Sequence, residues 1–484
     1  MIACLFFSPL FFFTPVFAQQ QWQFDKTTLK AYHHLLNLHT TEALALVANP
    51  RTAQDHYVAS ITQATELLIT EDPKQYSNYE DQFEKRLRRK TKTSSPTELF
   101  LQAETHLHWS FVCMKFGHDF DAALNLRQAY FIAKDCKKEF PEFIAIKKTI
   151  GLVYIVLGAI PEKYNWVLDI LGMEGSFESG LKQLGSADLV NSELGFEAKL
   201  LIALIQAFVL QNPDVGIQEI NSVLTLYPTN RLALFTGAAL RIKNSQSEEA
   251  LKLLSTLSVS NQGLPLHFAN YLLGEVYLQK GDYSNAITCY RKFRNNYGGQ
   301  NYLKDTMYKI GICYFLNGNV NDARVAFRLA KDTGSEITEA DKYAARHLGE
   351  NELPNIKLTK TRYATDGGYY EEAAKLLQSI TPKDLVTKCD QVEYYYRKAR
   401  LADKLKQLAP AKLFYKQTID MNGNEPWYFA PNSCLQLGYL ALDEKDLISA
   451  KSYFQMALSY KKHEYKNSID SKAKSALAQL TKRK

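Results

Sequence analysis

The sequence predicts an all-α protein, an α-solenoid of stacked helical hairpins, and three observations lead to this prediction. The chain has 484 residues, more than one ordinary hydrophobic core supports, so several domains or an extended repeat array are expected. It has only 23 glycines and 15 prolines, and their combined share of the chain is below the roughly 12% of average usage. This low share disfavours turn-rich sandwiches, barrels and propellers. Finally, a unit of about 37 residues recurs in the second half, with apolar residues at helical spacing.

Residues 1–18 are expected to be a secretory signal peptide. They carry no charged residue, centre on the apolar run 5–13, and end in the small residue Ala18. The run is shorter than the roughly 20 residues that a membrane-spanning helix needs. We therefore expect export with cleavage after Ala18, to a periplasmic or envelope-associated location. No basic residue precedes the run, so a start upstream of Met1 and an intracellular scaffold remain open alternatives.

Residues 19–196 are predicted to form a divergent region of helical hairpins. Trp109 and Cys113, followed by Gly117 and the pair Ala122-Ala123, have the spacing of one hairpin. The basic run 84–96 within this region would suit an anionic surface, but it ends in turn-forming residues. We interpret it as a solvated helix end with a linker, and we predict no nucleic-acid partner.

Residues 197–465 carry the repeat. Each of its four clearest units has apolar or small residues at relative positions 4, 7, 8 and 11, and again at 20, 24 and 27. The first group falls on one face of a helix and the second group on one face of a second helix. Small residues at positions 8 and 20 let the two helices approach closely, while the aromatic residue at position 24 is expected to fill space towards the next hairpin. These small anchors are Gly274 and Ala286, Gly311 and Ala323, Ala399 and Ala411, and Gly438 and Ala450.

Two units of the array are expected to be distorted. Extending the register backwards and forwards places Leu204 and Thr361 at position 8, where the best units have glycine or alanine. The step from Gly311 to Thr361 is also longer than the others, with extra sequence around 353–355 that predicts an additional loop or helical turn. The chain is expected to end in a basic helix end and tail, residues 466–484.

The repeat skeleton resembles the tetratricopeptide repeat, which has Leu-Gly at positions 7 and 8, alanine at 20, an aromatic residue at 24 and alanine at 27. The segment with Gly172, Gly175 and Gly180-Leu181 is similar to the tetratricopeptide-domain-39 and inclusion-body-clearance family. The resemblance to the repeat implies a superhelix whose first helices line a concave groove for a protein or peptide.

The resemblance also implies which residues line that groove. Positions 5 and 9 of the first helices are Tyr271 and Glu275, Tyr308 and Ile312, Tyr396 and Arg400, and Leu435 and Tyr439. Position 5 is tyrosine in three of these four units, and a row of tyrosines suits partner binding because the ring is apolar and the hydroxyl is polar. The alternative is that these tyrosines complete the packing between hairpins.

No pattern of catalytic or metal-ligating residues stands out. The chain has no phosphate-binding glycine loop, HExxH, GxSxG or EF-hand spacing. His106 and His108 lie two residues apart, so on a helix they point to different faces. The six cysteines beyond the signal peptide are widely spaced, which favours buried thiols, and only Cys289 and Cys313 are candidates for a disulfide. We predict no enzymatic activity, no catalytic residues, no metal and no cofactor.

These features predict an exported scaffold that binds a protein or peptide partner in its concave groove. A peripheral association with the cell envelope stays open. The alternative function is a surface glycan-binding protein of the nutrient-uptake type, in which exposed tyrosine and tryptophan rings would stack on sugars.

Overall fold

The computed structural model describes residues 21–88, 95–160, 172–259, 262–349 and 353–482. All secondary structure in these ranges is helical, so the predicted all-α fold is confirmed. The predicted signal peptide, residues 1–18, lies outside the described residues, as does part of the basic run 84–96. Within the described ranges, no helix is both long and apolar enough to cross a membrane.

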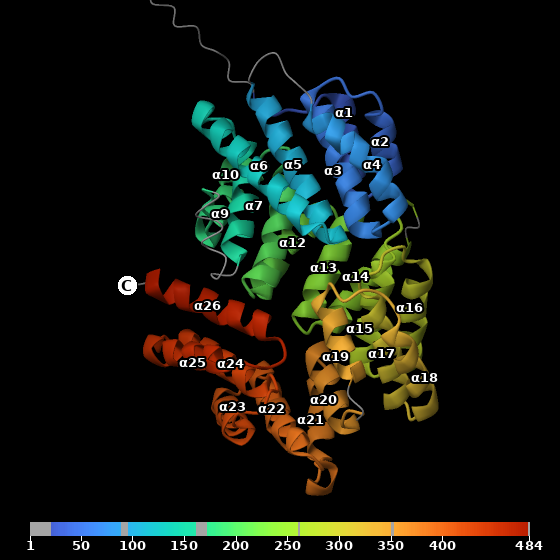
Figure 1. Ribbon diagram of the computed structural model, residues 1–484, viewed down its shortest axis with the longest axis vertical. Helices are drawn as coiled ribbons and strands as arrows, with labels where there is room; N and C mark the ends of the chain where they lie inside the picture. The colour runs from blue at the N-terminus through green and yellow to red at the C-terminus, as the bar shows by residue number, and fades with distance from the viewer. Residues whose placement is uncertain (1–20, 89–94, 161–171, 260–261, 350–352, 483–484) are drawn as a thin grey trace, which may run out of the picture.

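The N-terminal half is a set of antiparallel helices that pack mostly against their sequence neighbours (Figure 1). Its helices are α1 (Lys26–Leu36), α2 (Thr40–Leu46), α3 (Ala53–Thr70), α4 (Pro73–Leu87), α5 (Pro96–Phe116), α6 (Asp119–Glu139), α7 (Ile146–Ala159), α9 (Phe177–Leu184), α10 (Ala187–Val190), α11 (Gly195–Leu204) and α12 (Pro213–Leu226). The hairpin predicted around Trp109 is formed by α5 and α6. Gly151 on α7 faces Gly180 on α9, where an added Cβ would lie 2.9 Å from the Gly180 carbonyl oxygen.

The second half continues the array with more regular hairpins. Its helices are α13 (Arg231–Lys243), α14 (Ser247–Val259), α15 (Phe268–Lys280), α16 (Tyr283–Asn296), α17 (Leu303–Leu316), α18 (Val320–Lys331), α19 (Glu339–Gly349), α20 (Ile356–Gly367), α21 (Tyr370–Gln378), α22 (Lys388–Lys404), α23 (Leu408–Asn422), α24 (Phe429–Asp443), α25 (Leu447–Ser459) and α26 (Lys466–Lys482). Gly281 and Gly318, at φ +83° and +89°, occupy the left-handed conformation that turns α15 into α16 and α17 into α18.

The predicted small anchors hold the two helices of each hairpin together. An added Cβ at Gly274, Gly311 or Gly438 would lie 2.5 Å from the aromatic ring at position 24 of the same hairpin, which is Tyr290, Phe327 or Phe454 respectively. All four alanine anchors at position 20 are fully buried. The position-24 ring packs over the glycine of its own hairpin, because the missing side chain leaves the space it needs, and Phe454 also clusters with Ile469 and Ala473 of the following helix.

Both units expected to be distorted depart from the regular pattern. A π-helical turn, Ile205–Val209, follows Leu204 directly. The long step before Thr361 contains a whole extra helix, α19, rather than a loop or a single turn. Thr361 itself is fully buried, and its hydroxyl donates to the Lys357 carbonyl oxygen at 2.8 Å.

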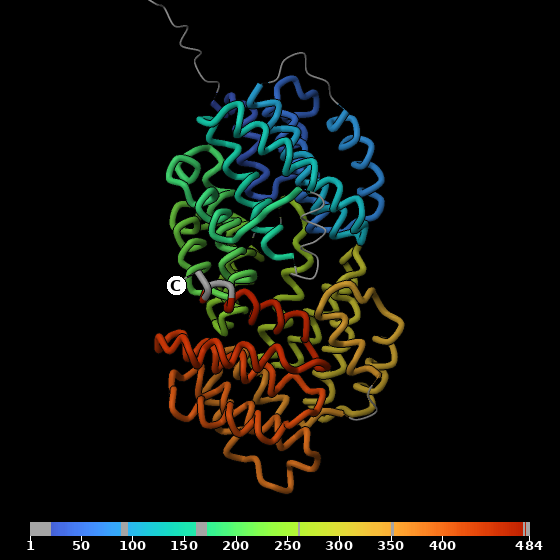
Figure 2. The backbone as a smooth tube through the Cα atoms, turned by 60° about the vertical axis from the view of Figure 1, so that its left-hand side comes forward, coloured from blue at the N-terminus to red at the C-terminus, as the bar shows by residue number. Residues whose placement is uncertain are grey.

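The curved array brings its C-terminal end back towards the middle of the molecule (Figures 1 and 2). The loop before α26 packs on α19, where Tyr465 stacks on Tyr343 with ring centroids 5.5 Å apart. Glu464 in the same loop lies 3.6 Å from the imidazole of His347. The segment expected to be a basic helix end and tail, residues 466–484, is mostly the helix α26, which buries Ile469 and Ala473 against the last hairpin.

Candidate functional site

The tyrosines predicted to line a groove are packed between consecutive hairpins. Tyr271, Tyr308 and Tyr396 are only 5%, 6% and 2% exposed. The Tyr271 hydroxyl donates to Asp305 on α17 at 2.7 Å, and the Tyr396 hydroxyl accepts from the amide of an asparagine on α24. Tyr308 lies against two rings of α19. The structure therefore favours the packing alternative for these tyrosines.

The remaining predicted groove residues divide into two groups. Ile312 and Leu435 are almost completely buried, each about 1% exposed. Glu275, Arg400 and Tyr439 keep part of their surface in contact with solvent. Of the eight predicted residues, only these three are accessible to a partner in this structure.

Glu275 belongs to an ion network that joins two hairpins. The Lys309 ammonium lies 2.7 Å from Glu275 and 2.9 Å from Asp305, and it donates to the Tyr271 hydroxyl at 2.9 Å. Burial by itself lowers the pKa of Lys309, but the two carboxylates outweigh it and hold that pKa well above its usual value. The lysine thus stays charged, and its three polar partners tie α15 to α17.

A second ion network lies in the core of the N-terminal half. Lys148 on α7 is 2.7 Å from Glu104 on α5 and 2.8 Å from Glu197 on α11, and it donates to the Tyr57 hydroxyl at 2.6 Å. His108 completes the group, 3.3 Å from Glu104. Burial would raise the pKa of Glu104, but Lys148 and His108 outweigh it and lower that pKa to about 2.

This network was not predicted from the sequence, although a signal for it exists. Lys148 and Glu104 each stand on a helix among apolar residues that face the core, and a buried charge of this kind needs a partner. The sequence could not show which charges meet, because the partners lie on three different helices. Every member is buried, so the network holds the helices together and presents nothing to a ligand.

A third group of charged residues differs from the two networks in composition. It consists of Lys243 at the end of α13, Arg400 and Lys404 on α22, and Lys472 on α26. Arg400 contributes to lowering the pKa of each of the three lysines, and Lys243 also contributes to lowering that of Lys472. We call these four residues the inner cation cluster.

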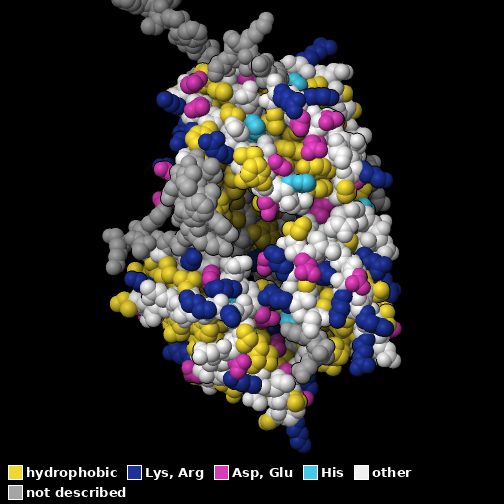
Figure 3. All heavy atoms as spheres, viewed as in Figure 1, with side chains coloured by type: hydrophobic (Ala, Val, Ile, Leu, Met, Phe, Trp, Pro, Cys, Tyr) yellow, Lys and Arg dark blue, Asp and Glu magenta, His cyan; other side chains and the backbone are white. Residues whose placement is uncertain are grey.

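The lysines of the inner cation cluster are solvent-accessible yet partly desolvated. Lys243 is exposed, and Lys404 and Lys472 are partly exposed. Nevertheless, surrounding protein atoms lower the pKa of each, and in Lys472 burial together with Lys243 and Arg400 lowers the pKa to about 8. Figure 3 shows the surface hollowed between the N-terminal half and the C-terminal hairpins.

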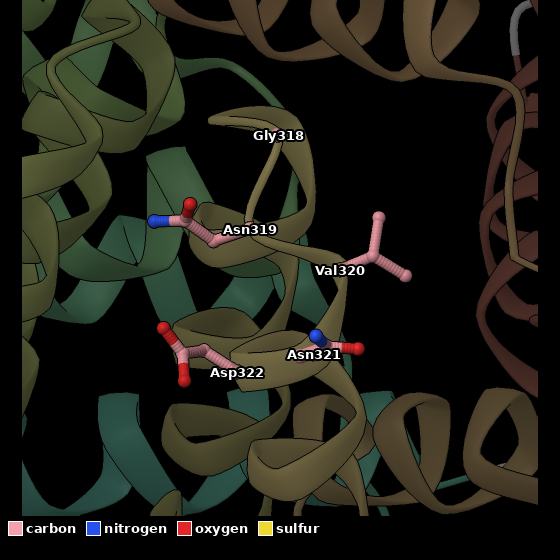
Figure 4. Close-up of a pocket in the computed structure, with 5 residues that line it drawn as sticks. All are labelled: Gly318, Asn319, Val320, Asn321 and Asp322. Atoms are coloured by element: carbon pink, nitrogen blue, oxygen red, sulfur yellow. The ribbon is translucent and has the colours of Figure 1, made fainter.

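The surface depression, the possible metal ligands and the cysteines of the described ranges offer no further candidate site. Residues 318–322 line a shallow depression at the turn between α17 and α18, where the side chains of Asn319 and Val320 point in opposite directions (Figure 4). Within the ranges that the structure describes, no three His, Cys, Asp or Glu side chains are placed to hold a metal. Cys289 and Cys313 are free thiols, so the candidate disulfide between them is not formed, and of the six cysteines in the described ranges all but Cys389 are buried.

Comparison with known families identifies tetratricopeptide repeats in this chain. Models of the tetratricopeptide repeat match residues 269–293, 305–332 and 392–425, which cover the predicted units around Gly274, Gly311 and Ala399. No curated protein sequence matches. The resemblance of residues 160–181 to the tetratricopeptide-domain-39 and inclusion-body-clearance family stays a prediction, and residues 161–171 lie outside the described residues.

Solved structures with similar chains have helical repeats but low similarity. A human IFIT1 dimer with m7Gppp-AAAA is 14% identical, with 95% of each chain covered and a TM-score of 0.34. Yeast Tom70 is 8% identical, with 94% of this chain and 89% of that chain covered and a TM-score of 0.33. The quorum sensor NprR from B. thuringiensis, in its apo form, is 13% identical over 82% and 97%, with a TM-score of 0.28.

Three tetratricopeptide repeats thus lie within an all-helical array of hairpins. Tetratricopeptide domains generally bind protein partners, and scaffolds of this type are typically non-catalytic.

Proposed function

We propose that the protein is an exported, non-catalytic scaffold that holds a protein partner on the inner side of its curved hairpin array. The observation that carries this proposal is the hollow between the two halves of the molecule (Figure 3). Charges left without internal partners are available to a ligand, whereas those of the two buried networks are not.

A crosslinking pair on one hairpin tests where the partner docks. A photo-crosslinking residue replaces the partly exposed Lys404, at the end of α22, and in a second variant replaces Lys416, which is exposed on the paired helix α23. We expect one defined protein adduct from position 404, identified by mass spectrometry, and none from position 416. Equal adducts from both positions would contradict docking on the inner side, and retention of glycans with no protein adduct would favour the glycan-binding alternative.

Export is tested separately, because the scaffold function does not depend on it. The apolar run 5–13 and the small residue Ala18 support a cleaved signal peptide. Sequencing of the mature chain should give Gln19 as the first residue. A mature protein that retains residues 1–18 would refute export and leave the scaffold proposal standing.

A further inference from the structure

We propose that helices α19 and α24 form a recognition surface for a partner segment in which an acidic residue precedes a tyrosine. In this structure the chain's own Glu464 and Tyr465 occupy that surface. This inference rests on the proposed scaffold function and adds the chemistry of the segment that is bound. Its tests use a short peptide and the purified chain, so either proposal can fail without the other.

The ring of Tyr465 lies between aromatic side chains of two helices. It stacks on Tyr343 of α19, with ring centroids 5.5 Å apart, and meets Tyr428 of α24 edge-on at 5.2 Å. The Arg346 guanidinium lies over the same ring, 5.5 Å from its centroid. A tyrosine from another chain can make the same contacts with these two rings and this cation.

Cations lie beside that ring and favour an acidic neighbour. The Glu464 carboxylate lies 3.6 Å from the imidazole of His347 on α19. Arg362 of α20 lies over the other ring of the stack, 5.1 Å from its centroid, and donates to its hydroxyl at 2.6 Å. Asp366 balances Arg362 in part, at 3.8 Å. The exposed Arg346 and a protonated His347 add further positive charge, which suits a carboxylate next to the bound tyrosine.

The present occupant is held less firmly than a core residue. Tyr465 has φ +55°, in the left-handed region that is unfavourable for a bulky side chain. It keeps part of its surface in solvent, as do Tyr343 and Tyr428, whereas Tyr271 and Tyr396 are almost completely buried. Strained residues of this kind gather at ligand clamps and switch regions. A partner segment with extended backbone can make the same contacts without that strain.

Release of the loop leaves the end of the array packed. Residues 460–465 link α25 to α26, and Figure 1 shows this link at the end of α26 that faces α19. Beyond it, α26 is anchored on the last hairpin by Ile469, Ala473 and Ala476. The occupant can therefore leave the surface without the unfolding of a helix.

Fluorescence anisotropy with a dye-labelled peptide tests the surface. The probe is Gly-Ser-Glu-Tyr-Gly-Ser, and the protein is the full mature chain with Tyr465→Ala, which empties the ring position. We expect saturable 1:1 binding to this variant and at least about tenfold weaker binding to the wild type, because the wild type's own segment competes at high effective concentration. A peptide with alanine in place of the tyrosine should bind about tenfold more weakly or worse. No saturable binding to the folded variant, or equal binding of the two peptides, would overturn the proposal.

A pair of further substitutions localises the binding. In the Tyr465→Ala background, Arg346→Gln removes the cation that lies over the ring and should weaken peptide binding severalfold. Lys342→Gln, at an exposed position on the same helix, removes the same charge and should leave the affinity unchanged. An equal loss in the two variants would show non-specific attraction and refute the site.

The wild-type chain gives a second measurement that needs no folded variant. Lys461 and Lys462 of the loop are exposed, and the peptide itself contains no site for trypsin. An excess of peptide that displaces the loop should therefore speed tryptic cleavage after these lysines severalfold. An unchanged cleavage rate at saturating peptide would contradict displacement.

The assembly state and the crosslinking experiment separate this proposal from others. A wild-type dimer that Tyr465→Ala dissociates would show that the surface binds the loop of a second copy, and would refute recognition of a different partner. A protein adduct at position 404 without any peptide binding would refute this surface and leave the proposed function standing. Peptide binding without such an adduct would support the surface and refute docking beside position 404.

Discussion

The buried network around Lys148 and the inner cation cluster use the same kinds of side chain to opposite effect. In the first, one lysine lies between Glu104 and Glu197, and all three are buried. In the second, Lys472 and its neighbouring cations outnumber the carboxylates and keep contact with solvent. Where carboxylates balance a lysine, the charged groups hold helices together. Where cations outnumber the carboxylates, the charged groups remain available to a ligand.

The network around Lys309 follows the buried type although it lies in the regular repeats. It again joins one lysine to two carboxylates and a tyrosine hydroxyl. Its first helix contributes Tyr271 and Glu275, two residues predicted to line the groove. In this part of the array, residues at groove positions thus strengthen the contact between hairpins.

The largest expected effect comes from breaking the balanced network. Lys148→Met leaves Glu104 and Glu197 buried without their cation, which should cost about 3–5 kcal/mol of stability. The neighbouring Lys147 pairs with Asp188 at the surface, so Lys147→Met should cost less than about 1 kcal/mol. Urea unfolding followed by circular dichroism measures both variants. A similar loss in the two would contradict the structural role of the buried network.

Much of the fold could be predicted because small residues recur at fixed positions of the repeat. Gly274, Gly311 and Gly438 have to be small, since each lies against an aromatic ring of its own hairpin. The same spacing located the irregular units around Leu204 and Thr361. It did not reveal α19, because an extra helix in a long step carries no repeat pattern of its own.

The candidate site could be predicted only in part, because a repeat pattern does not show how far the array curls. Arg400 was identified from its position in the unit, but Lys243, Lys404 and Lys472 were not. Lys243 and Arg400 affect Lys472 although the three residues are far apart in sequence, and a repeat pattern carries no signal for such long-range effects. The tyrosine row at position 5 was visible in the sequence, whereas its burial depends on how closely the next hairpin approaches.

A second test asks whether close hairpin packing, which positions both kinds of charged cluster, tolerates an added methyl group. An alanine Cβ at position 311 would lie 2.5 Å from the Phe327 ring, so Gly311→Ala should cost about 1–3 kcal/mol. An added Cβ at Gly349 meets no heavy atom within 4 Å, so Gly349→Ala should leave the melting temperature nearly unchanged. Equal melting temperatures of the two variants would contradict the close approach of α17 and α18.

A third test uses pH to separate the unbalanced cluster from the balanced one. The pKa of Lys472 is about 8 in the folded protein, below the usual value of about 10.4. Between these values the unfolded chain binds a proton that the folded protein has released, so this group makes stability rise with pH. The gain should be on the order of 1–2 kcal/mol, since the side chain is partly hydrated. It should be absent in Lys472→Gln and present in Lys451→Gln when thermal unfolding is compared at pH 7 and pH 10.

The smallest expected effect tests whether the Lys309 network behaves like the one around Lys148. Tyr271→Phe keeps the buried ring and removes only the hydroxyl that donates to Asp305 and accepts from Lys309. Because Lys309 still pairs with both carboxylates, the loss should be about 1 kcal/mol or less. Tyr271→Ala also removes the ring and should cost more, about 3 kcal/mol, since it opens a cavity between two hairpins. If Tyr271→Ala left thermal stability unchanged and weakened partner crosslinking at position 404, the tyrosine would serve binding rather than packing, and the first helices would line a groove as the repeat pattern predicts.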